Sequence, residues 1–241
     1  MAEGKYDKGL IANAGMMADT IRRLGIVPFF INSIPGYSIQ ELTRPGCWFD
    51  GDEDPLGPWD WKIDCIRDGD IAYGKFLCGG KASFATVPWY RELMNVRRAR
   101  LRPDTNGERI LACLEERGTI TIREVRGLLG VKKSAADAAI ARLQHQCRVV
   151  TGDISRVYRG QQMNYNGWQV ASFCTPESLF QSGQTQAAFP GFPVFEDEAD
   201  LSLETSHTPE ESLELLIGHI AEVTRSLRIA ASREDILKIL R

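Results

Sequence analysis

Three short helical patterns follow one another between residues 107 and 146, and each has its own start or stop signal. The first covers Glu108–Arg117, where apolar residues recur at helical spacing before a glycine. The second starts at Thr121, because Glu124 three residues later completes a capping box. A four-residue turn separates it from the third, over 135–146. Two helices joined by so short a turn predict a helix-turn-helix.

Two alternating runs follow the third helix, CRVVTGDI over 147–154 and SRVYRG over 155–160. Alternation of apolar and polar residues predicts the two strands of a hairpin. A helix-turn-helix followed by a hairpin is the order of a winged helix, in which the second helix of the motif usually enters a DNA groove. We therefore predict a winged-helix module, with its clearest signals over 107–160 and its full extent over 107–180.

The charge of the chain is unevenly distributed, although its formal total is only −3. Residues 91–160 carry 15 basic and 8 acidic residues, a net charge of +7, whereas residues 161–241 carry a net charge of −7. A local positive region can neutralise phosphates, and the release of their counterions supplies affinity for DNA. The predicted DNA-binding residues are Lys132, Lys133, Arg142, His145, Arg148, Arg156 and Arg159, with Lys75 and Lys81 from an earlier hairpin.

The third helix is poorly suited to reading a base sequence. Ala135, Ala136, Ala138 and Ala139 cannot donate or accept a hydrogen bond through their side chains. Contact with DNA is therefore expected to involve mainly the phosphate backbone, with modest sequence specificity. A protein-binding role remains the alternative, because winged helices also serve as protein–protein modules.

An earlier module is predicted over residues 9–102. Helical periodicity covers residues 9–24, and two apolar runs, IAYGKFL and KASFATV, meet at a pair of glycines and predict a hairpin. The following run, VPWYRELMNVRRARLRP, predicts a helix whose arginines suit its C-terminal end. A turn-rich stretch then separates the two modules.

The last part of the chain divides into a linker and helices. Residues 181–207 lack periodicity and are rich in Gly, Pro, Ser and acids, which predicts a surface linker. A capping box beginning at Thr208 starts helices over 208–241 that are expected to pack on the body. The expected fold is therefore α+β and mainly helical, with tandem winged-helix modules and small β-hairpin wings.

The segment GPWDWKID contains the strongest candidates for a site in the first module. Trp59 and Trp61 could stack on a base, and Asp60 could act as an acid or a base. The alternative is structural: one tryptophan anchors the helix in the core, and Asp60 balances the helix dipole in the first turn.

Several classes of site are not indicated. The three histidines and six cysteines show no metal-ligand spacing, and the sequence contains no Walker loop and no dinucleotide-binding glycine motif. No metal and no cofactor are therefore expected. No apolar run is long enough for a membrane span and no signal peptide is visible, so the expected location is the cytoplasm.

Four segments together resemble a known family. They are ADTIRRLGIVPFFINS, GPWDWKID, YGKFLCGGKASFATVPWYRELMNVRR, and ERILACLEERGTITIREVRGLLG continued through RVYRG and GWQVASFCTP. Over roughly residues 15–220 the chain resembles the AlkZ-related proteins, shorter and remote relatives of the AlkZ-like winged-helix DNA glycosylases. The resemblance implies stacked winged helices, a concave basic face and a role in DNA repair. It also implies that residues 9–100 are a divergent first winged helix, with residues 71–87 as its wing.

One departure from the glycosylases concerns the chemistry. The resemblance implies that a Gln-x-Gln or Gln-x-Asp motif, which positions the attacking water, should stand where this sequence has Pro28, Phe29 and Phe30. These side chains cannot accept a proton. Asn32 and Asp60 are the remaining, weaker catalytic candidates.

Three functions follow in order of preference. The first is a DNA-binding winged-helix protein that is related to the glycosylases and lacks their base-excision chemistry. The second is an active glycosylase that uses other residues, such as Asp60 or Asn32, on a flipped base. The third is a protein-interaction module in which the acidic segment 192–211 meets a partner.

Overall fold

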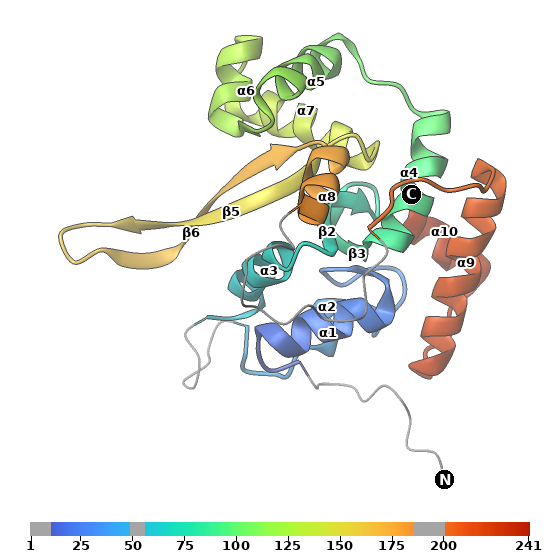
Figure 1. Ribbon diagram of the computed structural model, residues 1–241. Coiled ribbons are helices and arrows are strands. Elements are labelled where there is room, and N and C mark those ends of the chain that lie inside the picture. Colours follow the sequence, from blue (N-terminus) through green and yellow to red (C-terminus); the bar gives the residue numbers. More distant parts are fainter. Residues whose placement is uncertain (1–10, 49–55, 186–200) are drawn as a thin grey trace.

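The computed structural model describes residues 11–48, 56–185 and 201–241 (Figure 1). The fold is α+β and mainly helical, with two three-stranded antiparallel sheets, as the sequence predicts. The elements of the two sheets belong to two successive units of the chain. In each unit the order is helix, strand, helix, helix, strand, strand.

The first unit forms one sheet in the order β1-β3-β2, so that β3 is central. Asn13 caps its first helix by accepting a hydrogen bond from the Met16 amide, and Gly25 ends that helix with a φ of +72°. A Cβ at Gly25 would lie within 3 Å of the Trp89 side chain, so the position requires glycine. The unit consists of α1 (Ala14–Leu24), β1 (Ile26–Pro28), α2 (Ile39–Leu42), α3 (Pro58–Arg67), β2 (Ile71–Leu77) and β3 (Lys81–Thr86).

The second unit repeats this arrangement, with its sheet in the order β4-β6-β5. The capping box predicted at Thr121 is present, since Thr121 and Glu124 each bond the other's backbone amide. The repeated order of elements is not visible as a repeat in the sequence. The unit consists of α5 (Thr105–Arg117), β4 (Ile120–Thr121), α6 (Ile122–Leu129), α7 (Lys133–His145), β5 (Val150–Arg159) and β6 (Asn164–Cys174).

Two helices of the second unit start earlier than predicted. Helix α5 starts at Thr105, because the Asp104 side chain accepts a hydrogen bond from the Gly107 amide. Helix α7 starts at Lys133, two residues before the start that the sequence predicts. Lys132 occupies the cap position without a side-chain hydrogen bond, and its carbonyl accepts the first helical bonds.

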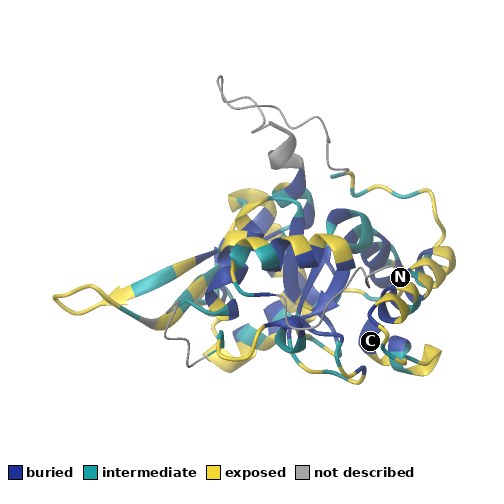
Figure 2. Cartoon of the chain, turned by 90° about the horizontal axis from the view of Figure 1, so that it is seen from below, coloured by how far each residue is buried: buried dark blue, intermediate teal, exposed yellow. Residues whose placement is uncertain are grey.

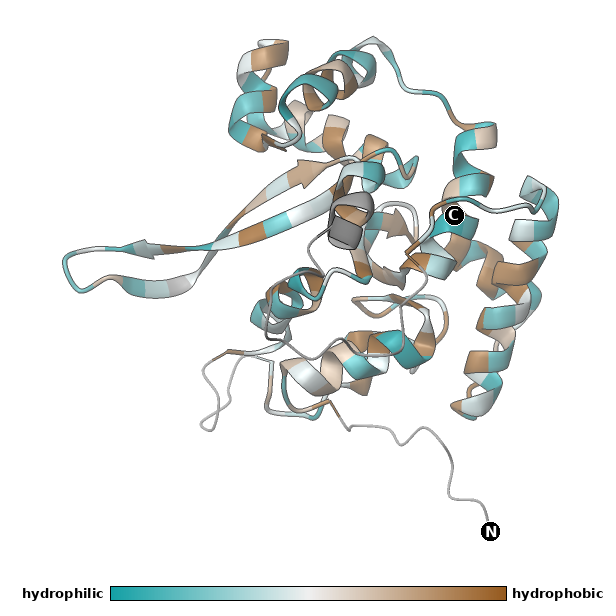
Figure 3. Ribbon diagram, in the orientation of Figure 1, coloured by the Kyte–Doolittle hydropathy of each residue, from teal (hydrophilic) through white to brown (hydrophobic). Residues whose placement is uncertain are grey.

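Four further helices join and cover the units: α4 (Val87–Arg100), α8 (Pro176–Thr185), α9 (Pro209–Ser226) and α10 (Arg233–Leu240). Helix α9 lies beside α4, with its apolar residues along one stripe (Figure 3). Helix α8 extends five residues into the segment that was expected to be a linker. Residues 186–200, which make up most of that segment and part of the acidic run proposed to meet a partner, lie outside the described residues.

The buried side chains form two hydrophobic clusters. The larger combines the first unit with α4, α9, α10 and the base of the β5–β6 hairpin. The smaller lies inside the second unit and includes Ile110, Val125, Ile140 and Leu143. The first unit is therefore stabilised by packing that involves the C-terminal helices, whereas much of the second unit has a small core of its own.

The two hairpins differ in exposure. The tip of β2–β3 is attached to the body, because the Cys78 amide donates to the carbonyl of Ile239 in α10 at 2.7 Å. The β5–β6 hairpin projects from the body, and its outer half is exposed (Figures 1 and 2). Trp168 in β6 is 59% exposed, and Tyr158, Met163 and Val170 are exposed as well.

Candidate functional site

A cavity of about 190 Å³ lies where the two units meet. Helix α3 and strand β2 of the first unit face α7, β5 and β6 of the second across it. Its wall combines apolar side chains with a few polar ones that come from all of these elements. The residues that concern the site are Trp59, Lys62, Tyr73, Gly74, Lys75, Gln144, Thr151 and Gln169.

The Asp60 carboxylate fixes the projecting hairpin to α3. Asp60 is 6% exposed, and its Oδ1 accepts from Arg156 Nε at 3.0 Å, Tyr165 OH at 2.5 Å and Gln169 Nε2 at 3.2 Å. Burial and the hydrogen bond to Asp60 both raise the pKa of Tyr165, so its phenol stays protonated and donates. The sequence candidate Asp60 therefore lies beside the cavity, with one carboxylate oxygen occupied by three donors.

Lys62 lies next to this cluster and is buried, at 2% exposure. Its Nζ donates to the Trp59 carbonyl and, at 2.5 Å, to Gln169 Oε1, and lies 3.5 Å from the centre of the Trp59 ring. Burial lowers the pKa of Lys62 to about 7, although Asp60 opposes the shift. Sequence reasoning missed Lys62, because a lysine after two tryptophans has no signature of burial.

An aromatic cluster occupies the positions that correspond, by resemblance, to the glutamine motif. The rings of Phe29 and Phe30 lie 6.1 Å and 6.5 Å from that of Trp59, measured between centroids, and Trp48 packs against both. Phe29 is fully buried. The place of the motif is therefore apolar and adjoins the cavity through Trp59, which is 38% exposed.

Two of the predicted site residues in the first unit have structural roles. Trp61 is 3% exposed, so its ring faces contact the core and cannot stack on a base. The Asn32 amide donates to the carbonyl of Tyr37 at 2.7 Å and accepts from the Ile34 amide at 2.8 Å. These bonds hold the loop after β1 and leave little of the amide for catalysis.

Six of the predicted cationic residues are exposed. Lys132 and Lys133 lie at the N-terminus of α7, and Arg142 lies near its C-terminus in an ion pair with Asp104. Lys75 lies at the cavity, while Lys81 starts β3. On the projecting hairpin, the exposed guanidinium of Arg159 lies 5.2 Å from the centre of the Trp168 ring.

His145 and Arg148 are placed differently. The Nε2 of His145 lies 2.8 Å from Arg97 Nη1, and burial lowers the pKa of His145 to about 4, so its ring is neutral. Arg97, which the sequence presents as one of several arginines at a helix end, is itself buried and donates to the carbonyls of Phe76, Leu240 and Arg241. Arg148 is half-buried nearby. Both predicted residues therefore belong to a junction inside the protein.

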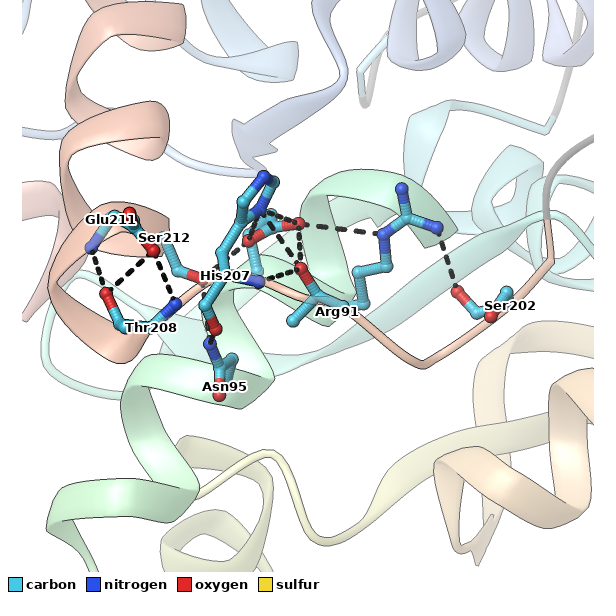
Figure 4. Close-up of polar contacts among 9 residues, drawn as sticks. Arg91, Asn95, Ser202, His207, Thr208, Glu211 and Ser212 are labelled. Atoms are coloured by element: carbon cyan, nitrogen blue, oxygen red, sulfur yellow. Dashed lines mark hydrogen bonds and ion pairs between the residues drawn. The ribbon is translucent and has the colours of Figure 1, made fainter.

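A second polar cluster surrounds the buried carboxylate of Glu92 on α4 (Figure 4). It accepts from Ser212 Oγ at 2.5 Å, Thr205 Oγ1 at 3.1 Å and His207 Nδ1 at 3.1 Å. Burial opposes ionisation of Glu92, but the bonds from Ser212 and His207 outweigh it and lower the pKa. Each donor belongs to α9 or the segment before it, so the cluster fastens α9 to α4.

Comparison with known proteins gives one match. The family model for AlkZ-related proteins matches residues 11–240, so the chain belongs to that family. The resemblance seen in the sequence is thereby confirmed. No curated protein and no solved structure matches the chain.

Two general features can be stated for the described parts of the chain. Among residues 11–48, 56–185 and 201–241, no three His, Cys, Asp or Glu side chains are grouped so that they could hold a metal ion. No helix within those ranges is both long and apolar enough to cross a membrane.

Proposed function

We propose that this protein binds DNA with two winged-helix modules, over residues 9–102 and 107–180, as a relative of the DNA glycosylases that lacks their glutamine-based excision. The observation that carries the proposal is the second unit, where α6, a short turn, α7 and a projecting hairpin follow one another. Its sheet order, β4-β6-β5, fits a winged helix. Membership of the AlkZ-related family supports the link to glycosylases.

Helix α7 would meet the phosphate backbone through its first turn. Lys132 and Lys133 are exposed there, at the positive end of the helix dipole. The other end of the helix is occupied: Gln144 is buried, accepts from the Lys75 amide and donates to Thr151 Oγ1. The helix therefore presents positive charge at its first turn and few side chains that could read bases along its length. This favours modest sequence specificity.

The projecting hairpin supplies the second part of the interface. Tyr158, Met163 and Trp168 are exposed there, and the guanidinium of Arg159 lies over the Trp168 ring. Aromatic rings stack on bases, and apolar side chains can enter the minor groove between base steps. Lys75 and Lys81 would add phosphate contacts from the first unit, whereas the buried Trp61 and the neutral ring of His145 would not.

Loss of glutamine-based excision is part of the proposal. Phe29 is buried among aromatic rings, and the Asn32 amide is bonded to its own loop. Asp60 is engaged by three donors, which suits a structural role better than activation of water. Incubation with alkylated duplex DNA should therefore release no base. Release that disappears in Asp60→Ala would favour the second candidate, an active glycosylase.

Fluorescence anisotropy with a labelled duplex tests DNA binding. We expect binding at ~50 mM salt that weakens steeply by ~200 mM salt. Replacing both Lys132 and Lys133 by Gln should lower affinity roughly tenfold and reduce the salt slope by about 2. The matched control replaces Arg225 and Arg228, two exposed arginines of the α9 region, by Gln. Absence of binding by the wild type at ~50 mM salt would overturn the proposal.

A further inference from the structure

Lys62 has an unusual set of partners for a buried lysine. Buried lysines are normally paired with an acid, because an isolated ammonium is costly to bury. Among the described residues, the groups that bind Nζ are neutral: the Trp59 carbonyl, Gln169 Oε1 and the Trp59 ring. The nearby carboxylate, Asp60, is already bonded to Arg156 and Tyr165.

The two oxygen partners of Nζ can be satisfied by a neutral amine. An NH₂ group has two N–H bonds and one lone pair, and two acceptor oxygens bind Nζ. The two N–H bonds of the neutral form can therefore both be used, which leaves the lone pair for another atom. Since burial lowers the pKa of Lys62 to about 7, a large share of the molecules carry this form at neutral pH.

The amine of Lys62 is also placed where it could react with a bound molecule. Lys62 lines the cavity between the units, which at about 190 Å³ is large enough for one five-carbon sugar. Trp59 lines the same cavity and is partly exposed, so its ring is available to a neighbouring base. Lys75, exposed on β2, is placed at the cavity to contact a phosphate.

We propose that Lys62 is a nucleophilic amine that forms a Schiff base with an aldehyde in this cavity, and that the aldehyde is the open-chain deoxyribose of an abasic site in DNA. The proposal rests on the proposed function for the delivery of DNA. Desolvated lysines commonly serve as nucleophiles toward carbonyl carbons.

The step balances without a further reagent. The lone pair of Nζ attacks C1′ of the aldehyde, the electrons of the C=O π bond move to oxygen, and one N–H proton passes to that oxygen to give a neutral carbinolamine. The hydroxyl then leaves as water together with the second N–H proton, and the electrons of that N–H bond form the double bond between Nζ and C1′. Gln169 and the Trp59 carbonyl hold the amine before the attack.

Borohydride trapping tests the proposal. Hydride reduces the Nζ–C1′ double bond to a stable secondary amine, which leaves protein and DNA covalently joined. With a labelled duplex that contains one abasic site, we expect an adduct on the peptide carrying Lys62, identified by mass spectrometry. Lys62→Arg should lower the yield at least tenfold, while Lys238→Arg, the same change at an exposed lysine of α10 outside the cavity, should retain it. An equal yield with Lys62→Arg would overturn the proposal.

Two controls separate the chemistry from DNA binding and from folding. Anisotropy and thermal melting show whether Lys62→Arg still folds and binds the duplex. Pyridoxal, a small aldehyde, followed by borohydride tests the amine without DNA, and we expect Lys62 to be labelled ahead of exposed lysines near pH 7. If pyridoxal labels Lys62 but the protein fails to bind DNA, the inference that the amine is reactive would stand. The inference that its substrate is an abasic site in DNA would be overturned. Labelling spread evenly over exposed lysines would overturn the reactive amine itself.

Discussion

The two units of this protein share an order of elements and a sheet order, yet they use their hairpins differently. In the first unit the β2–β3 hairpin is buried along most of its length, and its tip is bonded to α10. In the second, the β5–β6 hairpin extends from the body (Figure 2), and its Tyr158 and Trp168 side chains are exposed. A shared topology therefore does not fix a shared role: one hairpin builds the core, and the other remains available for contact.

The third helices of the two units, α3 and α7, also differ in whether their charged side chains face the interior or the solvent. Helix α3 directs Asp60 and Lys62 inward, toward partners on the other unit's hairpin. Helix α7 leaves Lys132 and Lys133 exposed at its start. Chemistry is therefore expected where the units meet, and attraction for phosphates at the outer surface.

The largest expected effect is on the free energy of unfolding, and it compares one substitution in each of the two hydrophobic clusters. Phe84 is fully buried in the central strand β3, so Phe84→Ala should lower the free energy of unfolding by about 3–5 kcal/mol. Val125→Ala, in the smaller core of the second unit, should cost about 1–2 kcal/mol, because fewer buried atoms are lost. Urea denaturation followed by circular dichroism measures both. Equal losses would contradict the expectation that the cost follows the number of buried atoms removed.

A second effect concerns the junction that joins the units to the C-terminal helix. Arg97→Met removes the donor that serves the carbonyls of Phe76 and Leu240, and should cost about 2–4 kcal/mol. Arg100→Met, one turn away and half-exposed beside Glu210, is the matched control and should cost well under 1 kcal/mol. If the two variants melt alike, the junction does not depend on Arg97.

A third effect depends on pH. The pKa of Lys62 is about 7 in the folded protein and ~10.4 in an unfolded chain, so between these values the unfolded state binds more protons. The stability of the wild type relative to Lys62→Met should therefore rise by roughly 1–3 kcal/mol from pH 7 to pH 10. Chemical denaturation of both proteins across this range measures the difference. A difference that stays constant would show that the ammonium is not disfavoured by folding.

The smallest effect on stability is expected at the exposed hairpin. Trp168→Ala should change the free energy of unfolding by less than about 0.5 kcal/mol, because the side chain is largely in water. The same change should weaken DNA binding several-fold through loss of stacking, worth ~1–3 kcal/mol per base in related cases. Denaturation and anisotropy on one preparation give both values. A large loss of stability would place Trp168 among structural residues.

The features that could be predicted from the sequence are those that depend on residues close together in the chain. The strands β2 and β3 follow from two apolar runs around a pair of glycines, and the capping boxes at Thr121 and Thr208 mark where α6 and α9 begin. These features depend on residues within a few positions of one another. They are confirmed, as is the family.

What depends on distant residues could not be predicted. Lys62 is buried because Gln169, more than a hundred positions later, bonds its Nζ. Arg97 resembles the solvated arginines around it until the C-terminal carbonyls are placed beside it. For Trp168, alternation along a strand shows which residues share a face, but not whether the strand leaves the body.

Gln169 belongs to the projecting hairpin, yet it provides one of the two oxygen acceptors of the Lys62 amine. The surroundings of that amine are therefore completed by a segment whose outer half is in solvent. A partner that bends or grips the hairpin would change the distance between Gln169 and Nζ, and with it the proton affinity of the amine. Binding of a partner to the hairpin and protonation of the Lys62 amine would then be linked, so that each changes the free energy of the other.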